Sequence, residues 1–136
     1  MYLEPTQAQG AAFFGVPREG PVVMLNLLRF REIADYAASP ELKPEMRVSG
    51  REAYRLYAAH TLPHLAAAGS EILFQGTAEQ YLIGPDTERW ELVILVKHAS
   101  AEAFLSFAQN PEYLAGIGHR TAALADSRLL PVFPST

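Results

Sequence analysis

Two continuous apolar runs constrain the fold of this chain more than any other feature. Val22–Leu28 is apolar at every position except Asn26, and Leu92–Val96 is apolar at all of its positions. A strand with one face in water alternates apolar and polar side chains, whereas a strand covered on both faces is apolar throughout. We therefore expect both runs to be strands of a sheet whose two faces are both covered.

Caps and turn residues place the other elements around these two strands. Ser49 and Glu52 have capping-box spacing, Ser100 and Asn110 are N-cap residues, and Gly76 is expected to carry a bulge. The expected elements are helices over 6–14, 49–68, 100–107 and 110–125, and strands over 71–83, 90–97 and 128–133.

The order strand, helix, strand, strand, helix, strand predicts an α+β fold of the ferredoxin-like βαββαβ kind. Right-handed crossovers then place both helices on one face of an antiparallel sheet. Pro131 agrees with this topology, because a proline cannot donate to both neighbours and the last strand lies at an edge. We expect residues 1–21 to form an extension with a short helix and residues 22–136 to form one domain, in which 31–49 is a long loop.

Something must cover the second face of such a sheet, since its strands are apolar on both sides. The expected cover is the same face of another copy, which predicts a homodimer, the dimeric α/β barrel. The alternative is that the N-terminal helix or the long loop covers this face within one chain.

Composition removes several other classes of function. The 136 residues carry a net charge of −4 with no basic run, which argues against nucleic acid as a partner. No cysteine is present, so disulfides and thiolate chemistry are excluded. The N-terminus lacks a secretory pattern and no apolar run reaches the length of a membrane span, so we expect no membrane association and a cytoplasmic location.

Several motifs resemble the bacterial family described only as domain of unknown function 1330, over Val22–Val132 and thus most of the chain. The matching segments are Val23–Leu28 with Phe30-Arg31-Glu32, Ser49–Tyr54, Leu82-Ile83-Gly84-Pro85, Trp90, Ala103-Phe104-Leu105, Pro111-Glu112-Tyr113, His119-Arg120 and Ala125–Leu129. The resemblance implies the dimeric α/β-barrel fold and no established activity.

Asn26 is the most informative candidate for a functional residue, because an amide within an apolar strand needs hydrogen-bond partners. It either contacts a ligand or ties down neighbouring backbone. With Asn26 we group His119, Tyr57 and His60 as candidate catalytic residues, since histidine titrates near neutral pH. The candidate substrate-binding residues are Arg120, Trp90 and Tyr81. For Arg120 the alternative is an ion pair with Asp126 or Glu112.

Three functions are open at this point. The first is a cofactor-independent isomerase or monooxygenase-like reaction on a small organic acid or aromatic, and the second is a small-molecule-binding or sensor dimer. The third is haem binding, because the resemblance in fold to haem-degrading enzymes implies roles for Asn26 and His119, although His98 replaces their tryptophan. We expect no metal, since His60 and His64 have i, i+4 spacing but no third ligand.

Overall fold

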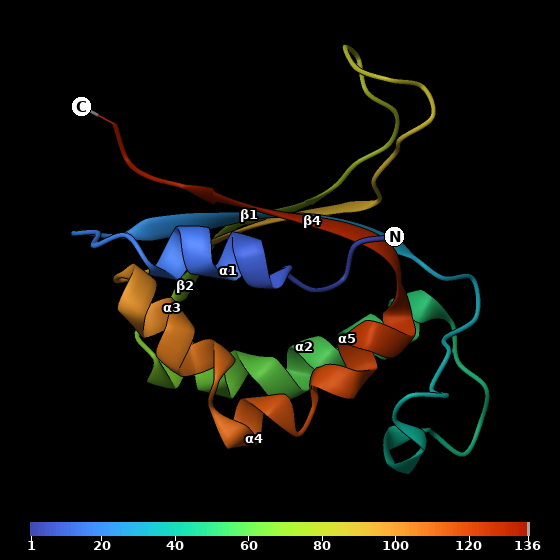
Figure 1. Ribbon diagram of the computed structural model, residues 1–136. Helices are drawn as coiled ribbons and strands as arrows, with labels where there is room; N and C mark the ends of the chain where they lie inside the picture. The colour runs from blue at the N-terminus through green and yellow to red at the C-terminus, as the bar shows by residue number, and fades with distance from the viewer. Residues whose placement is uncertain (136) are drawn as a thin grey trace.

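The computed structural model describes residues 1–135 and has a four-stranded sheet with the helices on one side (Figure 1). The strands are β1 (Val22–Phe30), β2 (Glu71–Thr77), β3 (Leu92–His98) and β4 (Leu124–Val132). Their order is β2-β3-β1-β4, and every neighbouring pair is antiparallel. This is the ferredoxin-like βαββαβ arrangement, so the predicted fold class is confirmed. The edge position of β4 agrees with the prediction from Pro131.

Four of the five α-helices within residues 1–135 begin directly after the residue at which the sequence predicts a helix to start, and the fifth begins without a predicted cap residue. They are α1 (Gln7–Phe14), α2 (Gly50–Ala67), α3 (Ala101–Ala108), α4 (Pro111–Leu114) and α5 (Ile117–Ala123), with a 3-10 turn η1 (Pro40–Leu42) in the long loop. The Ser49 side chain accepts a hydrogen bond from the amide of Glu52, but the Glu52 carboxylate pairs with Arg55. Only half of the expected capping box is therefore present at α2.

The strand expected over 71–83 is wrong in its second half. β2 ends at Thr77, which pairs with Leu92, the first residue of β3. No strand lies beside residues 80–83 for this reason, and they belong to a loop that spans 78–91. The irregularity in β2 falls between Ile72 and Phe74 and not at Gly76.

The helix expected over 110–125 is broken at Gly116. A Cβ atom on this glycine would lie 2.1 Å from the ring of His60, so α2 packs too closely there for a larger residue. The chain also enters β4 at Leu124, four residues before the expected start at Arg128.

The core lies between the sheet and the helices. Val22, Met24 and Leu28 of β1 are 0–2% exposed, and alternate residues of a strand share a face, so these three side chains point toward the helices. Leu25 and Leu27 point to the other face, as do their partners Leu130 and Arg128.

No helix covers that second face. α1 lies on the same side of the sheet as the other helices, and Phe14 stacks on Phe104 of α3 at 6.2 Å between ring centroids (Figure 1). The long loop also extends toward the helix side (Figure 1). The alternative in which either segment covers the second face is therefore wrong.

Within residues 1–135, none of the helices combines the length and the apolar character that crossing a lipid bilayer requires.

Candidate functional site

Asn26 lies on the helix-facing side of β1 and is less buried than its neighbours on that side. Met24 and Leu28, two positions to either side, are 2% and 0% exposed, yet Asn26 itself is only half-buried. Leu129, its partner on β4 and therefore on the same face, is 47% exposed. Solvent thus reaches the helix-facing side of the sheet at the middle of β1.

The Asn26 amide makes two hydrogen bonds to backbone, and both are long. Its Nδ2 donates to the carbonyl oxygens of Met24 at 3.3 Å and Ile94 at 3.4 Å. Typical N–H···O distances are about 2.7–3.2 Å, so these bonds hold the amide loosely. Asn26 therefore contacts the backbone of β1 and β3 through long hydrogen bonds and stays half-buried.

Three tyrosines form a row of ring contacts on the helix side. Tyr54 and Tyr57 of α2 have ring centroids 5.3 Å apart, and the hydroxyl oxygen of Tyr57 lies 2.8 Å from that of Tyr113 of α4. Burial raises the pKa of Tyr54 and of Tyr113 well above the ordinary value. These two hydroxyls are therefore protonated at neutral pH and can donate hydrogen bonds, but they cannot act as bases.

Arg120 of α5 brings a positive charge to the same layer. This charge acts to lower the pKa of Tyr54 and Tyr113, against the larger rise from burial, so the guanidinium lies near both hydroxyls. Its Nη1 donates to the carbonyl oxygen of Leu3 at 3.0 Å, and its Nη2 donates to Ser127 Oγ at 3.5 Å.

The ion pair that was the alternative role for Arg120 is not formed. Asp126 instead pairs with Arg128, at 2.8 Å between Nη1 and Oδ1. Within the described chain no carboxylate oxygen lies within 4.0 Å of an Arg120 nitrogen. Arg120 is thus a partly buried cation without an anionic side chain beside it.

The two candidate histidines have other partners. His119 Nδ1 lies 2.7 Å from the hydroxyl of Tyr36, and burial, followed by the nearby His60, lowers the pKa of His119. His60 Nε2 donates to the carbonyl oxygen of Glu112 at 2.7 Å. No hydrogen bond within residues 1–135 joins either histidine to Asn26.

Tyr36 was not predicted from the sequence, although it contacts His119 and is 7% exposed. The one sequence feature that could have indicated Tyr36 is that it is the sole aromatic residue of the polar loop 31–49. The rings of His60 and His64 lie 5.2 Å apart, and the described residues contain no group of three or more His, Asp or Glu side chains that could hold a metal ion.

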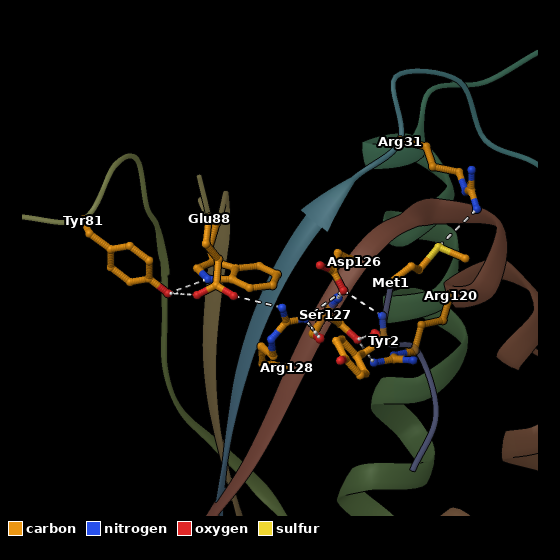
Figure 2. A network of polar contacts seen from close by, with 10 residues as sticks. Met1, Tyr2, Arg31, Tyr81, Glu88, Arg120, Asp126, Ser127 and Arg128 are labelled. Carbon is orange, nitrogen blue, oxygen red and sulfur yellow. Dashed lines mark hydrogen bonds and ion pairs between the residues drawn. The ribbon is translucent and has the colours of Figure 1, made fainter. Parts of the chain in front are cut away.

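Trp90 and Tyr81 belong to a separate cluster within the 78–91 loop, and Figure 2 shows its members Tyr81, Glu88 and Arg128 side by side. Trp90 Nε1 donates to the Tyr81 hydroxyl at 2.7 Å, and that hydroxyl donates to Glu88 Oε2 at 2.7 Å. Glu88 pairs with Arg128 at 2.9 Å. The structure thus brings Asn26, Tyr57 and Arg120 to the layer between sheet and helices, whereas Trp90 and Tyr81 hold a loop.

Comparison with known proteins gives a family without a described activity. The family model described as Domain of unknown function (DUF1330) matches residues 44–132. A crystal structure of the methylated RPA0582 protein has 35% sequence identity to this chain and a TM-score of 0.88, and the match covers 99% of this chain and 96% of that one. A second crystal structure, described as the RPA0582 protein of unknown function from Rhodopseudomonas palustris, has 35% identity and a TM-score of 0.86, and the match covers 98% of this chain and 96% of that one. No protein with a curated description matches.

Proposed function

This chain belongs to the DUF1330 family, and from its candidate site we propose that it binds a small organic acid whose carboxylate lies against Arg120. One observation carries the proposal. Arg120 is a partly buried cation that lies near protonated tyrosine hydroxyls, and no carboxylate side chain of residues 1–135 neutralises it. The proposed place is the layer between sheet and helices, which solvent reaches at Asn26.

The chemistry of the donors favours an anion. Removing a charge from water costs several kcal/mol unless an opposite charge compensates it. A guanidinium has five N–H donors, and the hydrogen bonds to Leu3 and Ser127 use two different nitrogens. A carboxylate accepts charge-assisted bonds from such a group, and the hydrogen-bonded pair of Tyr57 and Tyr113 hydroxyls has one O–H left to donate. The rings of Tyr54 and Tyr57 favour a flat apolar body on the acid.

Binding fits the geometry better than catalysis. The isomerase or monooxygenase hypothesis needs a base beside the substrate, and His119 and His60 were the candidates for this role. Their hydrogen bonds to Tyr36 and to the Glu112 backbone engage one nitrogen of each ring. Raised pKa values keep Tyr54 and Tyr113 from acting as bases at neutral pH. The haem hypothesis stays a prediction, and a haemin titration of the wild type and of His119→Ala tests it.

Benzoate and benzamide test the proposal, because they share a shape and differ in charge. We expect benzoate to raise the melting temperature and to bind measurably by calorimetry, and benzamide to bind at least about tenfold more weakly. Arg120→Gln should weaken benzoate binding by at least about tenfold, and Tyr57→Phe by a smaller factor.

Two variants serve as controls for Arg120→Gln. Arg55→Gln removes an exposed cation that pairs only with Glu52, and Ser127→Ala removes a hydrogen bond of Arg120 but keeps its charge. Both should bind benzoate as the wild type does. Equal binding of benzoate and benzamide, or unchanged binding by Arg120→Gln, would contradict the proposal. Chromatography of the bound acid after incubation shows whether the protein also transforms it.

We also propose that the protein is a homodimer that pairs through the second face of the sheet. On this face Leu25 lies between Leu95 and Leu130, and Leu27 lies between Val93 and Arg128, whose charge pairs with Glu88 and Asp126. Leu130 is 56% exposed. An apolar face of this kind is characteristic of an interface, and a second copy covers it by two-fold symmetry.

A further inference from the structure

We propose that the loop 78–91 is an arm that crosses to a second copy of this chain and packs its tip, Leu82 and Ile83, against the partner. The inference rests on the proposed homodimer and adds a contact that the sheet faces alone do not make. The hydrogen bonds within the loop, the exposure of its tip, and its place above the uncovered face support it together.

The tip of the loop has no cover within its own chain. Residues 79–87 are all exposed, and at their centre Leu82 is 100% exposed and Ile83 is 92% exposed. Single exposed apolar residues are ordinary, but two adjacent aliphatic side chains wholly in water at the end of a projecting loop gain from any contact that buries them.

Specific contacts of Tyr81, Glu88 and Trp90 fix the loop on both sides of its tip (Figure 2). Trp90 is 3% exposed, and its indole N–H donates to Tyr81, whose hydroxyl donates to Glu88. Glu88 pairs with Arg128 of β4, and the Arg128 guanidinium lies 4.9 Å from the centroid of the Trp90 ring. These contacts fasten the loop to β4 through Arg128 and so fix the direction in which the loop leaves the sheet.

Gly84 shapes the tip. Its φ of 157° lies in the region that favours glycine, and a Cβ atom there would lie 2.7 Å from the ring of Tyr81. The backbone therefore passes close over the Tyr81 ring. Leu82 and Ile83, between these two residues, are directed outward.

The loop is long enough to reach a partner. It rises on the side of the sheet opposite the helices (Figure 1). Half of the 78–91 loop is about seven residues, which span up to roughly 23 Å when extended. Packed sheets lie about 10 Å apart. This upper bound exceeds the spacing between packed sheets, so the length of the loop allows its tip to reach the flank of a partner.

The area of the sheet face also calls for a second contact. Four strands about 4.8 Å apart and about seven residues long give a footprint of roughly 450 Å². A stable interface buries about 800 Å² on each partner, which is about a tenth of the 8907 Å² surface of this chain. Two arms, one from each copy, add apolar contact area at the edge of the same face. The uncovered sheet face and the loop lie on the same side of the chain. One two-fold dimer can therefore bury both the sheet face and the tip of the loop.

The double variant Leu82→Asp/Ile83→Asp tests the arm by sedimentation velocity over a range of concentrations. We expect the dissociation constant of the dimer to rise by at least about tenfold, because two charges replace the apolar tip. Met46→Asp is the matched control, since Met46 is 80% exposed in the long loop on the helix side. It should leave the dissociation constant unchanged. Circular dichroism shows whether each variant is folded.

A cross-linking experiment locates the tip directly. The chain has no cysteine, so Ile83→Cys carries a benzophenone maleimide at one defined site. Dimers mixed from ¹⁴N and ¹⁵N chains should then give cross-linked peptides that join the two isotopes. Cross-links only within one chain, or a double variant that dimerises as the wild type does, would overturn the arm. A wild type that is monomeric would overturn the dimer with it, whereas benzoate binding, measured on the same variants, reports on Arg120 alone.

Discussion

His98 shows what it costs to place a titratable side chain in the core of this protein. It is 2% exposed, and its ring lies against Phe104 and Phe107. Its Nδ1 lies 2.7 Å from the Oγ of Ser70. Burial lowers the pKa of His98 to about 4, because the imidazolium would lose its hydration there.

His98 should therefore make stability depend on pH. Its pKa is lower in the folded state than in the unfolded state, so the unfolded state binds the proton first as the pH falls. Its contribution is fully present above about pH 6.5 and is lost progressively toward pH 4, by roughly 3 kcal/mol in total. Urea unfolding at several pH values should show a shallower loss in His98→Gln than in the wild type. The pKa of His119 is also lowered, so the variant should still lose some stability at low pH. The quantity to compare is therefore the slope of unfolding free energy against pH, and equal slopes in the variant and the wild type would contradict the role of His98.

At the scale of elements, two glycines in helices test how closely α2 packs on its neighbours. A Cβ atom on Gly50 would lie 2.2 Å from the carbonyl oxygen of Arg31 and 2.6 Å from that of Ala123. Gly10 in α1 has nothing within 4 Å of that position. We expect Gly50→Ala to lower the free energy of unfolding by about 1–3 kcal/mol, and Gly10→Ala to raise it by about 0.5–1 kcal/mol. Chemical denaturation measures both, and a neutral Gly50→Ala would contradict the observed packing.

Local signals predicted where helices begin, and long-range contacts decided where elements end. The Thr6, Ser49, Ser100 and Asn110 side chains all accept the cap hydrogen bonds expected of such residues. The break at Gly116 depends on the ring of His60, which lies 56 positions earlier in the chain. Similarly, β2 ends at Thr77 because β3 starts at Leu92. Neither contact leaves a signal in the local sequence.

At the scale of the whole molecule, the sequence predicted the topology well and the site only in part. The order of helices and strands along the chain, with right-handed crossovers, predicted the topology, and Pro131 agreed with it. The placement of Asn26, Tyr57 and Arg120 in one layer follows from that topology. The orientation of the His119 side chain does not follow from the topology, because it depends on a contact with Tyr36 in the long loop. The sequence also could not show that Asp126 forms its ion pair with Arg128 and not with Arg120.

The uncovered sheet face gives the last prediction, which concerns the protein as an assembly. If two copies bury Leu25 and its neighbours, folding is linked to association, and the melting temperature must rise with protein concentration. Leu25→Lys places a charge in the proposed interface, where the partner would bury it without an opposite charge. We therefore expect this variant to be a folded monomer whose melting temperature does not depend on protein concentration. Leu56→Lys, at a 41% exposed position on α2, should behave as the wild type. Light scattering that gives a mass of 15.0 kDa for the wild type across the micromolar range would contradict the proposed dimer.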